Sequence, residues 1–385
     1  MNEMFTIDDI KNDPTFQKFL NKKKGISEST TKGYIYALRR FANHTGKTPT
    51  QIHDIHRKDL RERAAEFDMW LSNALDEYVS YLIDEGVFAS TIKLNISKIK
   101  SFLHAFKLRP TPEVEISKRD IKEDAKYLLK VEDIRKAIKH STPTYQTLFI
   151  VQAQTGLSVS DALLLDVGDF IKAVSKRNEK LTLKEAIYRV KTDDDVIECL
   201  DLRRKKTTQE FYTFIGPEAL RSIAELIESR AEEYQTPDSP VFIKDIVKVH
   251  DEEHRKDLRL RVINVENYVT KMHECKGIFP RILVNRKERS YFRTHKIRKW
   301  YANKLRFKAK FQTDDVKYLM GQTTGDVIEH YIDPNNYRAL KDNYRLALPY
   351  LAINDEIVIK KDTEAMERME EKLKIIEEEN KLLKE

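Results

Sequence analysis

Two prolines close together, Pro110 and Pro112, place the strongest constraint on how this chain folds. Proline fixes its own φ and restricts the residue before it, so no helix runs through this stretch. Apolar residues recur at helical spacing before the prolines, whereas helical and strand-like patterns alternate after them. The sequence therefore predicts a leader at 1–17, a helical domain at 18–108, a linker at 109–121, a second domain at 122–355 and a C-terminal helix at 356–385.

Three helices are predicted in the first domain. Ser27 can cap a helix that Gly46 ends, a second helix runs around Trp70 to Leu82, and a third starts near Ser90. Their apolar stripes report burial and say nothing of chemistry. The polar sides carry clustered cations, which we take as candidate DNA contacts: Lys22, Lys23, Lys24, Lys32, Arg39, Arg40, Lys93 and Lys98.

Composition narrows the class of protein. Seventy Lys and Arg against 63 Asp and Glu give a net charge of +7 and a pI near 9.0, which with local basic runs favours a polyanion partner. Cys199 and Cys275 form no CxxC motif, which argues against a disulfide framework or a zinc site and for a reducing compartment. The first residues show no secretory signal, and the chain has no apolar run of about eighteen residues. We therefore expect a cytoplasmic protein without a membrane span.

The second domain is predicted to be mainly α with a small antiparallel sheet. Helices are expected at 131–140, 146–154 and 217–233, and strands at 186–190, 196–200 and 210–214. A cationic turn precedes the last strand and contains Arg203, Arg204, Lys205 and Lys206.

The tail has a different character. Met366, Met369, Leu373, Ile376, Asn380 and Leu383 fall on alternating heptad positions among Glu and Lys. About three heptads are short for an isolated coiled coil, so a helix that docks on a neighbouring subunit is an equal alternative. Both alternatives predict self-association.

The most informative stretch for chemistry contains His295, Arg298, Gln322 and Tyr331. A phenol with a pKa of about 10 is a poor nucleophile, and it attacks a phosphodiester only where cations stabilise the phosphoryl oxygens. Arg298 offers a planar fork that matches two such oxygens, and His295 lies one helical turn before it. Twelve Lys or Arg lie between positions 281 and 310 against the single acid Glu288, and Lys296 and Lys299 are further candidate DNA contacts.

These motifs resemble the active site of the tyrosine recombinase (phage integrase) family. That family shows H-x-L-R, then L-G-H, then Y, where this chain has His295-Lys-Ile-Arg298, Met320-Gly321-Gln322 and Tyr331. Upstream, Thr155-Gly-Leu-Ser158 resembles the first catalytic box, T-G-L-R. The first phosphate-binding arginine of the family falls on Ser158, which lacks both the charge and the fork.

The resemblance implies a helical core-binding domain followed by a catalytic domain that together clamp double-stranded DNA. Tyr331 would form a 3′-phosphotyrosyl link, and Arg298 and His295 would serve the phosphate. Gln322 cannot relay a proton, so its role would be to position the phosphate. Lys206, or alternatively Lys205, would protonate the leaving 5′ oxygen, and Arg203 or Arg204 could offset the charge missing at Ser158.

The resemblance further implies a homotetramer on paired DNA sites, association with the nucleoid, and no need for a metal or another cofactor. The divergent motifs favour an archaeal or viral integrase of a mobile element.

Several alternatives stay open. The change at Ser158 fits a subgroup that supplies the cation from elsewhere, a substituted variant, or a DNA-binding accessory protein that has lost cleavage. A type IB topoisomerase-like enzyme would share the tyrosine chemistry. The lysines near 205 could touch phosphates without moving a proton, and Tyr337 and Tyr344 compete with Tyr331 as nucleophile. His250 and His254 have the spacing of a metal pair, but a polar surface insertion is the preferred interpretation.

Overall fold

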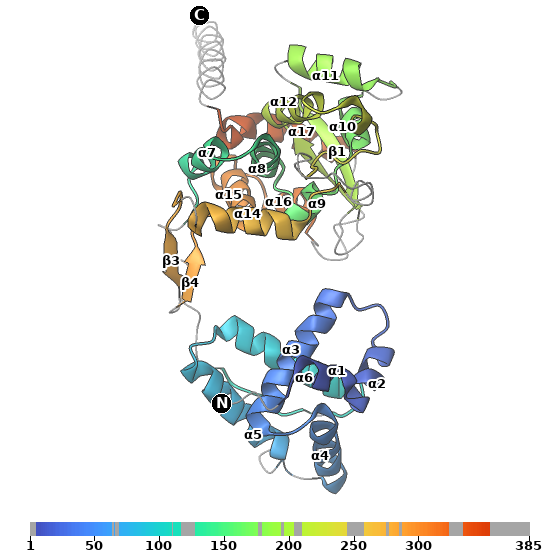
Figure 1. Cartoon of the computed structure of the whole chain (residues 1–385), viewed down its shortest axis with the longest axis vertical. Helices are drawn as coiled ribbons and strands as arrows, with labels where there is room; N and C mark the ends of the chain where they lie inside the picture. Colours follow the sequence, from blue (N-terminus) through green and yellow to red (C-terminus); the bar gives the residue numbers. More distant parts are fainter. Residues whose placement is uncertain are drawn as a thin grey trace, which may run out of the picture. The chain divides into compact units, whose positions relative to one another are not determined.

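The computed structural model describes residues 5–63, 65, 69–109, 111–116, 128–175, 179–193, 196–203, 210–244, 258–274, 277–284, 287–322 and 334–354. The chain forms two compact units (Figure 1). The first comprises 1–123 with 283–288, and the second comprises 124–282 with 289–385.

Apart from residues 283–288, the described part of the first unit is helical. Its helices are α1 (Ile7–Asn12), α2 (Pro14–Lys22), α3 (Glu28–Thr45), α4 (Pro49–Glu62), α5 (Trp70–Asp84) and α6 (Ala89–His104). The three predicted helices are confirmed as α3, α5 and α6. The hydroxyl of Ser27 accepts a hydrogen bond from the Thr30 N–H at the start of α3, and Gly46 ends the helix with a φ of 68°.

Three further helices, α1, α2 and α4, were not predicted. Ile10 and Phe16 lie within the expected leader, yet both are fully buried in the core of this unit. The buried carboxylate of Asp13 accepts hydrogen bonds from the N–H groups of Phe16 (2.9 Å) in α2 and Thr50 (3.1 Å) in α4. This one side chain therefore caps α2 and joins it to α4, a pairing that no sequence periodicity reveals.

The second unit contains most of the remaining elements. Its helices are α7 (Val131–Lys139), α8 (Pro143–Thr155), α9 (Val159–Ala162), α10 (Val167–Val174), α11 (Leu183–Thr192), α12 (Pro217–Glu228), α14 (Val262–Glu274), α15 (Thr294–Asn303), α16 (Thr313–Leu319) and α17 (Pro334–Leu351). A 3-10 turn, η3 (Glu232–Tyr234), and a π-helical turn, η5 (Lys304–Lys308), complete the helical part.

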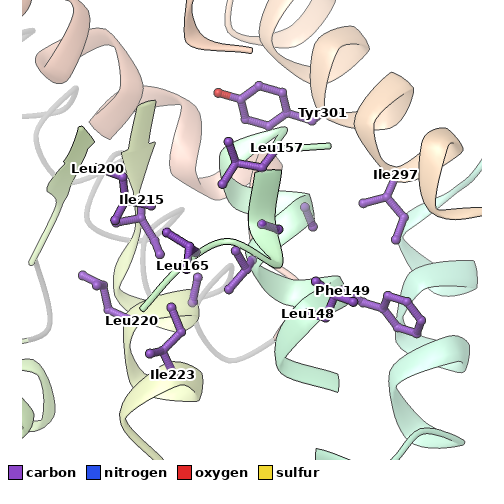
Figure 2. Packing of buried hydrophobic residues seen from close by; sticks show 14 of the residues in the cluster. Leu148, Phe149, Leu157, Leu165, Leu200, Ile215, Leu220, Ile223, Ile297 and Tyr301 are labelled. Carbon is purple, nitrogen blue, oxygen red and sulfur yellow. The ribbon is translucent and has the colours of Figure 1, made fainter. Parts of the chain in front are cut away.

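Helix α8 lies at the centre of this unit, in contact with α7, α12, α15, α17 and strand β2 (Glu210–Ile215). Nearly every residue from Thr144 to Thr155 is buried, which is the pattern of a helix that is covered on all sides. Figure 2 shows Leu148 and Phe149 of α8 packed in the core to which α12, α15 and the sheet also contribute. The end of α8 is thus held firmly in place.

The predicted fold class, mainly α with a small antiparallel sheet, is confirmed, but the strands differ in detail. β1 (Glu198–Arg203) pairs antiparallel with β2, and β3 (Arg281–Val284) pairs with β4 (Lys287–Ser290), a hairpin that was not predicted. The strand expected at 186–190 is wrong, because these residues lie in α11. A capping box between Thr182 and Glu185 begins this helix, and it outweighs the local strand-like pattern.

No helix in the described ranges is both long and apolar enough to cross a membrane.

We predict that Gly156→Ala destabilises the second unit by about 2–5 kcal/mol, the sum of left-handed backbone strain and overpacking. Gly156 ends α8 with a φ of 66°, and an added Cβ would meet the ring of Tyr301. Gly277 is the matched control, since it has a φ of 56° and nothing within 4 Å of an added Cβ. Gly277→Ala should cost only about 1–2 kcal/mol. Chemical denaturation of both variants measures the difference, and equal losses would contradict the packing argument.

Candidate active site

Arg298 joins two segments that are distant in sequence. Its side chain is 4% exposed, and Nη1 donates to the carbonyl of Gly156 (2.6 Å) while Nη2 donates to the carbonyl of Met320 (2.7 Å). Gly156 caps the C-terminal end of α8 and Met320 caps that of α16. Helix C-termini carry partial negative charge, so a cation between two of them is favourably placed. The structure thereby brings together the Thr155–Ser158 and Met320–Gln322 motifs, which the sequence analysis identified.

Each of these two motifs forms a tight glycine turn that lies against an aromatic ring. Gly156 has its φ of 66° beside Tyr301 (Figure 2 shows this ring next to Leu157), and Gly321 has a φ of 63° beside Phe211. At Gly321 the chain closes α16 with two backbone bonds, from the Gly321 N–H to Tyr318 (2.7 Å) and from the Gln322 N–H to Lys317 (2.8 Å). This pair of bonds is the Schellman pattern, in which glycine fits the left-handed position. Gln322 is fixed at the edge of this turn and is partly exposed.

Ser158 caps a helix. Its hydroxyl donates to the carboxylate of Asp161 (2.6 Å) and accepts from the Asp161 N–H (3.2 Å), at the start of the single turn α9. Asp161 is buried. The hydroxyl hydrogen is therefore already used within the protein, which makes Ser158 a weak replacement for a phosphate-binding arginine.

His295 lies in the first turn of α15, one turn before Arg298, and its side chain is exposed. Partial burial lowers the pKa of this imidazole from its ordinary value, and the nearby Lys299, Arg298 and Arg293 lower it further. The ring therefore favours its neutral form more than a free imidazole does. A neutral imidazole has one donor and one acceptor nitrogen, so it can either accept a proton or donate a hydrogen bond to a phosphate.

The two competing tyrosines are engaged elsewhere. Tyr344 is fully buried, its hydroxyl donates to the carbonyl of Gln154 (2.7 Å), and burial raises its pKa well above the ordinary value. The Tyr337 ring packs against Tyr212 at 5.3 Å between centroids, and burial followed by interactions with Cys199 raises its pKa. Neither phenol is suited to ionise and attack a phosphate.

Several predicted site residues lie outside the described ranges. They are Tyr331, Arg204, Lys205 and Lys206, together with the histidines His250 and His254. Arg203 is the last residue of β1, where it is exposed and pairs in register with Glu210. In the part of the chain that the structure describes, no group of three or more His, Cys, Asp or Glu side chains could hold a metal ion.

The predicted DNA contacts differ in accessibility. Lys22, Lys24, Lys32, Lys93 and Lys299 are exposed, whereas Lys23, Arg39, Arg40 and Lys98 are partly buried. Lys296 is only 4% exposed, and its ammonium lies 4.9 Å from the centre of the Tyr291 ring. A buried ammonium over an aromatic ring is better suited to packing than to the predicted contact with DNA.

A cavity of about 690 Å³ on the first unit brings predicted DNA contacts together with Arg109, which the sequence did not single out. Lys23 and Lys93 line it together with Lys100, His104 and Arg109, against the one acid Glu115. His104 also bonds to Thr111 (2.9 Å), which holds the start of the expected linker beside α6. The basic residues at helical spacing in the sequence indicated part of this cavity. The contact between the linker and α6 could not be predicted from the sequence.

The comparisons with known proteins agree with these motifs. Residues 14–109 match the phage integrase N-terminal SAM-like domain. The chain is 27% identical over 206 residues to the tyrosine recombinase XerD of Staphylococcus haemolyticus (strain JCSC1435). Over these segments the chain is similar to tyrosine recombinases. The match covers 48% of this chain and 61% of the length of that relative.

The fold is also similar to that of a solved structure. The structure of the Tn1549 transposon integrase in complex with a circular intermediate DNA gives a TM-score of 0.50 at 14% identity, over 85% of this chain and 98% of that one. A lambda integrase tetramer bound to a Holliday junction gives 0.48 at 12% identity, over 83% and 78% respectively. The first of these supports the same fold.

We predict that Arg298→Lys destabilises the protein by about 2–4 kcal/mol, because one ammonium lacks the fork and leaves a buried carbonyl of Gly156 or Met320 without its donor. Lys299→Ala, at the neighbouring exposed position, should change the free energy of unfolding by less than about 0.5 kcal/mol. Denaturant titration at fixed pH measures both. An Arg298→Lys variant as stable as the wild type would show that the two carbonyls do not depend on the guanidinium.

Proposed function

We propose that this protein is a site-specific DNA recombinase or integrase that cuts and rejoins DNA through a 3′-phosphotyrosyl intermediate. The observation that carries the proposal is the position of Arg298, which holds the 155–158 and 320–322 segments together beside His295. A phosphodiester seated there would lie close to the buried charge of Arg298, whose Nη atoms already donate to two carbonyls, and would meet the His295 imidazole and the Gln322 turn. The homology to XerD is independent support.

The proposed chemistry is a transesterification in two steps. The phenol oxygen of Tyr331 attacks the phosphorus in line, its proton leaves to a neighbouring base such as His295, and the bond to the 5′ oxygen breaks. Lys206, with Lys205 as the alternative, protonates that leaving oxygen. A 5′ hydroxyl of a partner duplex then attacks the phosphotyrosine and gives its proton to the lysine, while the Tyr331 oxygen leaves and takes a proton back from the base. One ester is exchanged for another in each step, so the bond energy is retained and ATP is not consumed.

The proposed substrate is double-stranded DNA, and the proposed assembly is a homotetramer on two paired sites. The exposed cations of α2, α3 and α6 and the basic cavity beside α6 provide phosphate contacts on the first unit. Such a protein would be associated with the nucleoid. Sequence-specific contacts would come from side chains that reach base edges, and phosphate contacts alone would position the protein.

We predict that wild-type protein forms a covalent complex with a duplex that is nicked next to the cleavage site, and that Tyr331→Phe abolishes it. The nick releases a short 5′-hydroxyl strand, which traps the phosphotyrosine. Tyr337→Phe is the matched control, since this partly buried phenol packs against other rings, and it should keep the covalent band. Denaturing electrophoresis of labelled DNA gives the result. A band that survives Tyr331→Phe would identify a different nucleophile, and strand-exchanged products would separate a recombinase from a topoisomerase.

A second candidate function is a DNA-binding accessory protein with weakened cleavage. The hydroxyl of Ser158 is committed to Asp161, so no side chain at this position meets the phosphate with a charge. Each such donor in a catalytic pocket is worth on the order of 10²–10³ in rate.

If cleavage is weakened by the missing charge at position 158, we predict that Ser158→Arg raises the rate of covalent complex formation by at least about tenfold. The new guanidinium would lie next to the buried carboxylate of Asp161, which can orient it. Ser158→Gln is the uncharged control of similar reach. Single-turnover rates on the nicked duplex measure the effect, and an unchanged rate would show that another cation, such as Arg203 or Arg204, already serves this place.

A further inference from the structure

One face of helix α6 is polar along most of its length. Lys93, Ser97, Lys100 and His104 lie at intervals of three or four residues, so all four project from the same side of the helix. This side lines the cavity of about 690 Å³ on the first unit. The opposite side of α6 is apolar and packs in the core of that unit. The polar side is therefore not required for the core and can serve a ligand.

The start of the expected linker lines another side of this cavity. Val114 and Ile116 line it while they pack against the core cluster of the first unit, and Pro112 is buried. The stretch 111–116 is thus seated on the same unit as α6. Lys23, the residue that caps the C-terminal end of α2, contributes from a third segment. All three segments belong to one unit, so the shape of the cavity is set within that unit.

The lining of the cavity carries an excess of positive charge. Its four permanent cations are Lys23, Lys93, Lys100 and Arg109, against the one acid Glu115. Like charges around one cavity repel one another, and an anion between them relieves that repulsion. Double-stranded DNA supplies one negative charge per about 1.7 Å of helix axis. A backbone phosphate is therefore a ligand that fits the charge of this lining.

His104 is the group in this lining that titrates near neutral pH. Its Nε2 shares a hydrogen bond with the Thr111 hydroxyl (2.9 Å). A hydroxyl can donate or accept, so this bond is kept whether the ring is neutral or charged. Within the described part of the chain the ring makes no other hydrogen bond, which leaves Nδ1 able to donate to an anion once it carries a proton.

The surroundings of His104 make its charge depend on what the cavity holds. Partial burial lowers the pKa of this imidazole, and Arg109, Lys100 and Lys23 lower it further. Without an anion the ring therefore favours its neutral form. A phosphate would offset the three cations and accept a hydrogen bond from the ring, and both effects favour the protonated form. By linkage, a proton on His104 then strengthens phosphate binding to the same extent.

We propose that the cavity beside α6 binds a phosphate of the DNA backbone and takes up a proton at His104 as it does so. This inference rests on the proposed function, because it takes double-stranded DNA as the substrate. The contact would be independent of base sequence. Its sign follows from the linkage: affinity for DNA rises as the pH falls through the range in which imidazole titrates. The rise levels off once the ring is protonated in the free protein as well.

The test measures binding of the full-length protein to a labelled duplex of arbitrary sequence, by fluorescence anisotropy at about pH 8 and about pH 6. For the wild type we expect the dissociation constant to fall about three- to tenfold at the lower pH. The slope of the logarithm of affinity against the logarithm of salt concentration should also steepen by about one at the lower pH. This second change reports a new phosphate contact, which a purely structural role of His104 would not produce.

Two substitutions of His104 separate its charge from its shape. His104→Gln can still bond to Thr111 but cannot take up a proton, so it should lose both changes. His104→Lys carries a fixed charge, so at about pH 8 it should bind within about twofold of the wild type at about pH 6. His53→Gln is the matched control, because this histidine of α4 pairs with Asp54 (2.8 Å), lies outside the lining of the cavity and should keep wild-type behaviour.

The outcomes separate this inference from the proposed function. If His104→Gln keeps the full pH dependence of the wild type, the inference is wrong, while a covalent complex on the nicked duplex would still support the proposed function. A pH effect that His104→Gln removes, without any steepening of the salt dependence in the wild type, would also overturn the inference, since the ring would then only hold the linker. A wild-type protein that binds the duplex at neither pH would reject the proposed function together with this site.

Discussion

The buried guanidinium of Arg298 is the interaction on which the candidate site depends. A buried cation is costly unless acceptors surround it, and here the carbonyls at the ends of α8 and α16 accept its hydrogen bonds. The same two bonds satisfy carbonyls that a helix end leaves without partners. Removal of either glycine turn, or of the arginine, would therefore disturb the end of α8, the end of α16 and helix α15 together.

Helix α8 gives that interaction its rigidity. Because it is buried along nearly its whole length, its C-terminal end is fixed by packing on several sides. The ring of Tyr301 packs against Gly156. Hydrogen bonds of Gln154 and Thr155 connect the same end to α12, α17 and β2. A reacting group placed here is held to small displacements, which is what in-line attack on a phosphorus requires.

Ser158 shows how far this chain departs from the pattern that it otherwise resembles. The position keeps its place at the start of α9 and its acidic neighbour Asp161, but it carries a capping hydroxyl where a charge would act on the phosphate. The proposed cleavage would therefore need a cation from another position to supply the charge that Ser158 lacks. His295 and Arg298 lie one turn apart on α15, and Arg298 binds the turn that precedes Gln322.

The sequence by itself determined the helical character of the first unit, the caps at Ser27 and Gly46, the break at the prolines and the motifs at 155–158, 295–298 and 320–322, because these depend on local backbone preferences and spacing. It did not reveal that residues 183–192 are helical, that Ile10 and Phe16 are core, or that Lys296 is buried. Only the tertiary structure decided that Arg298 binds carbonyls of two distant helix ends and that Gln154 lies between α12 and α17. Those contacts join residues far apart in the chain, and side-chain packing in three dimensions selects them, which no periodicity along one sequence encodes.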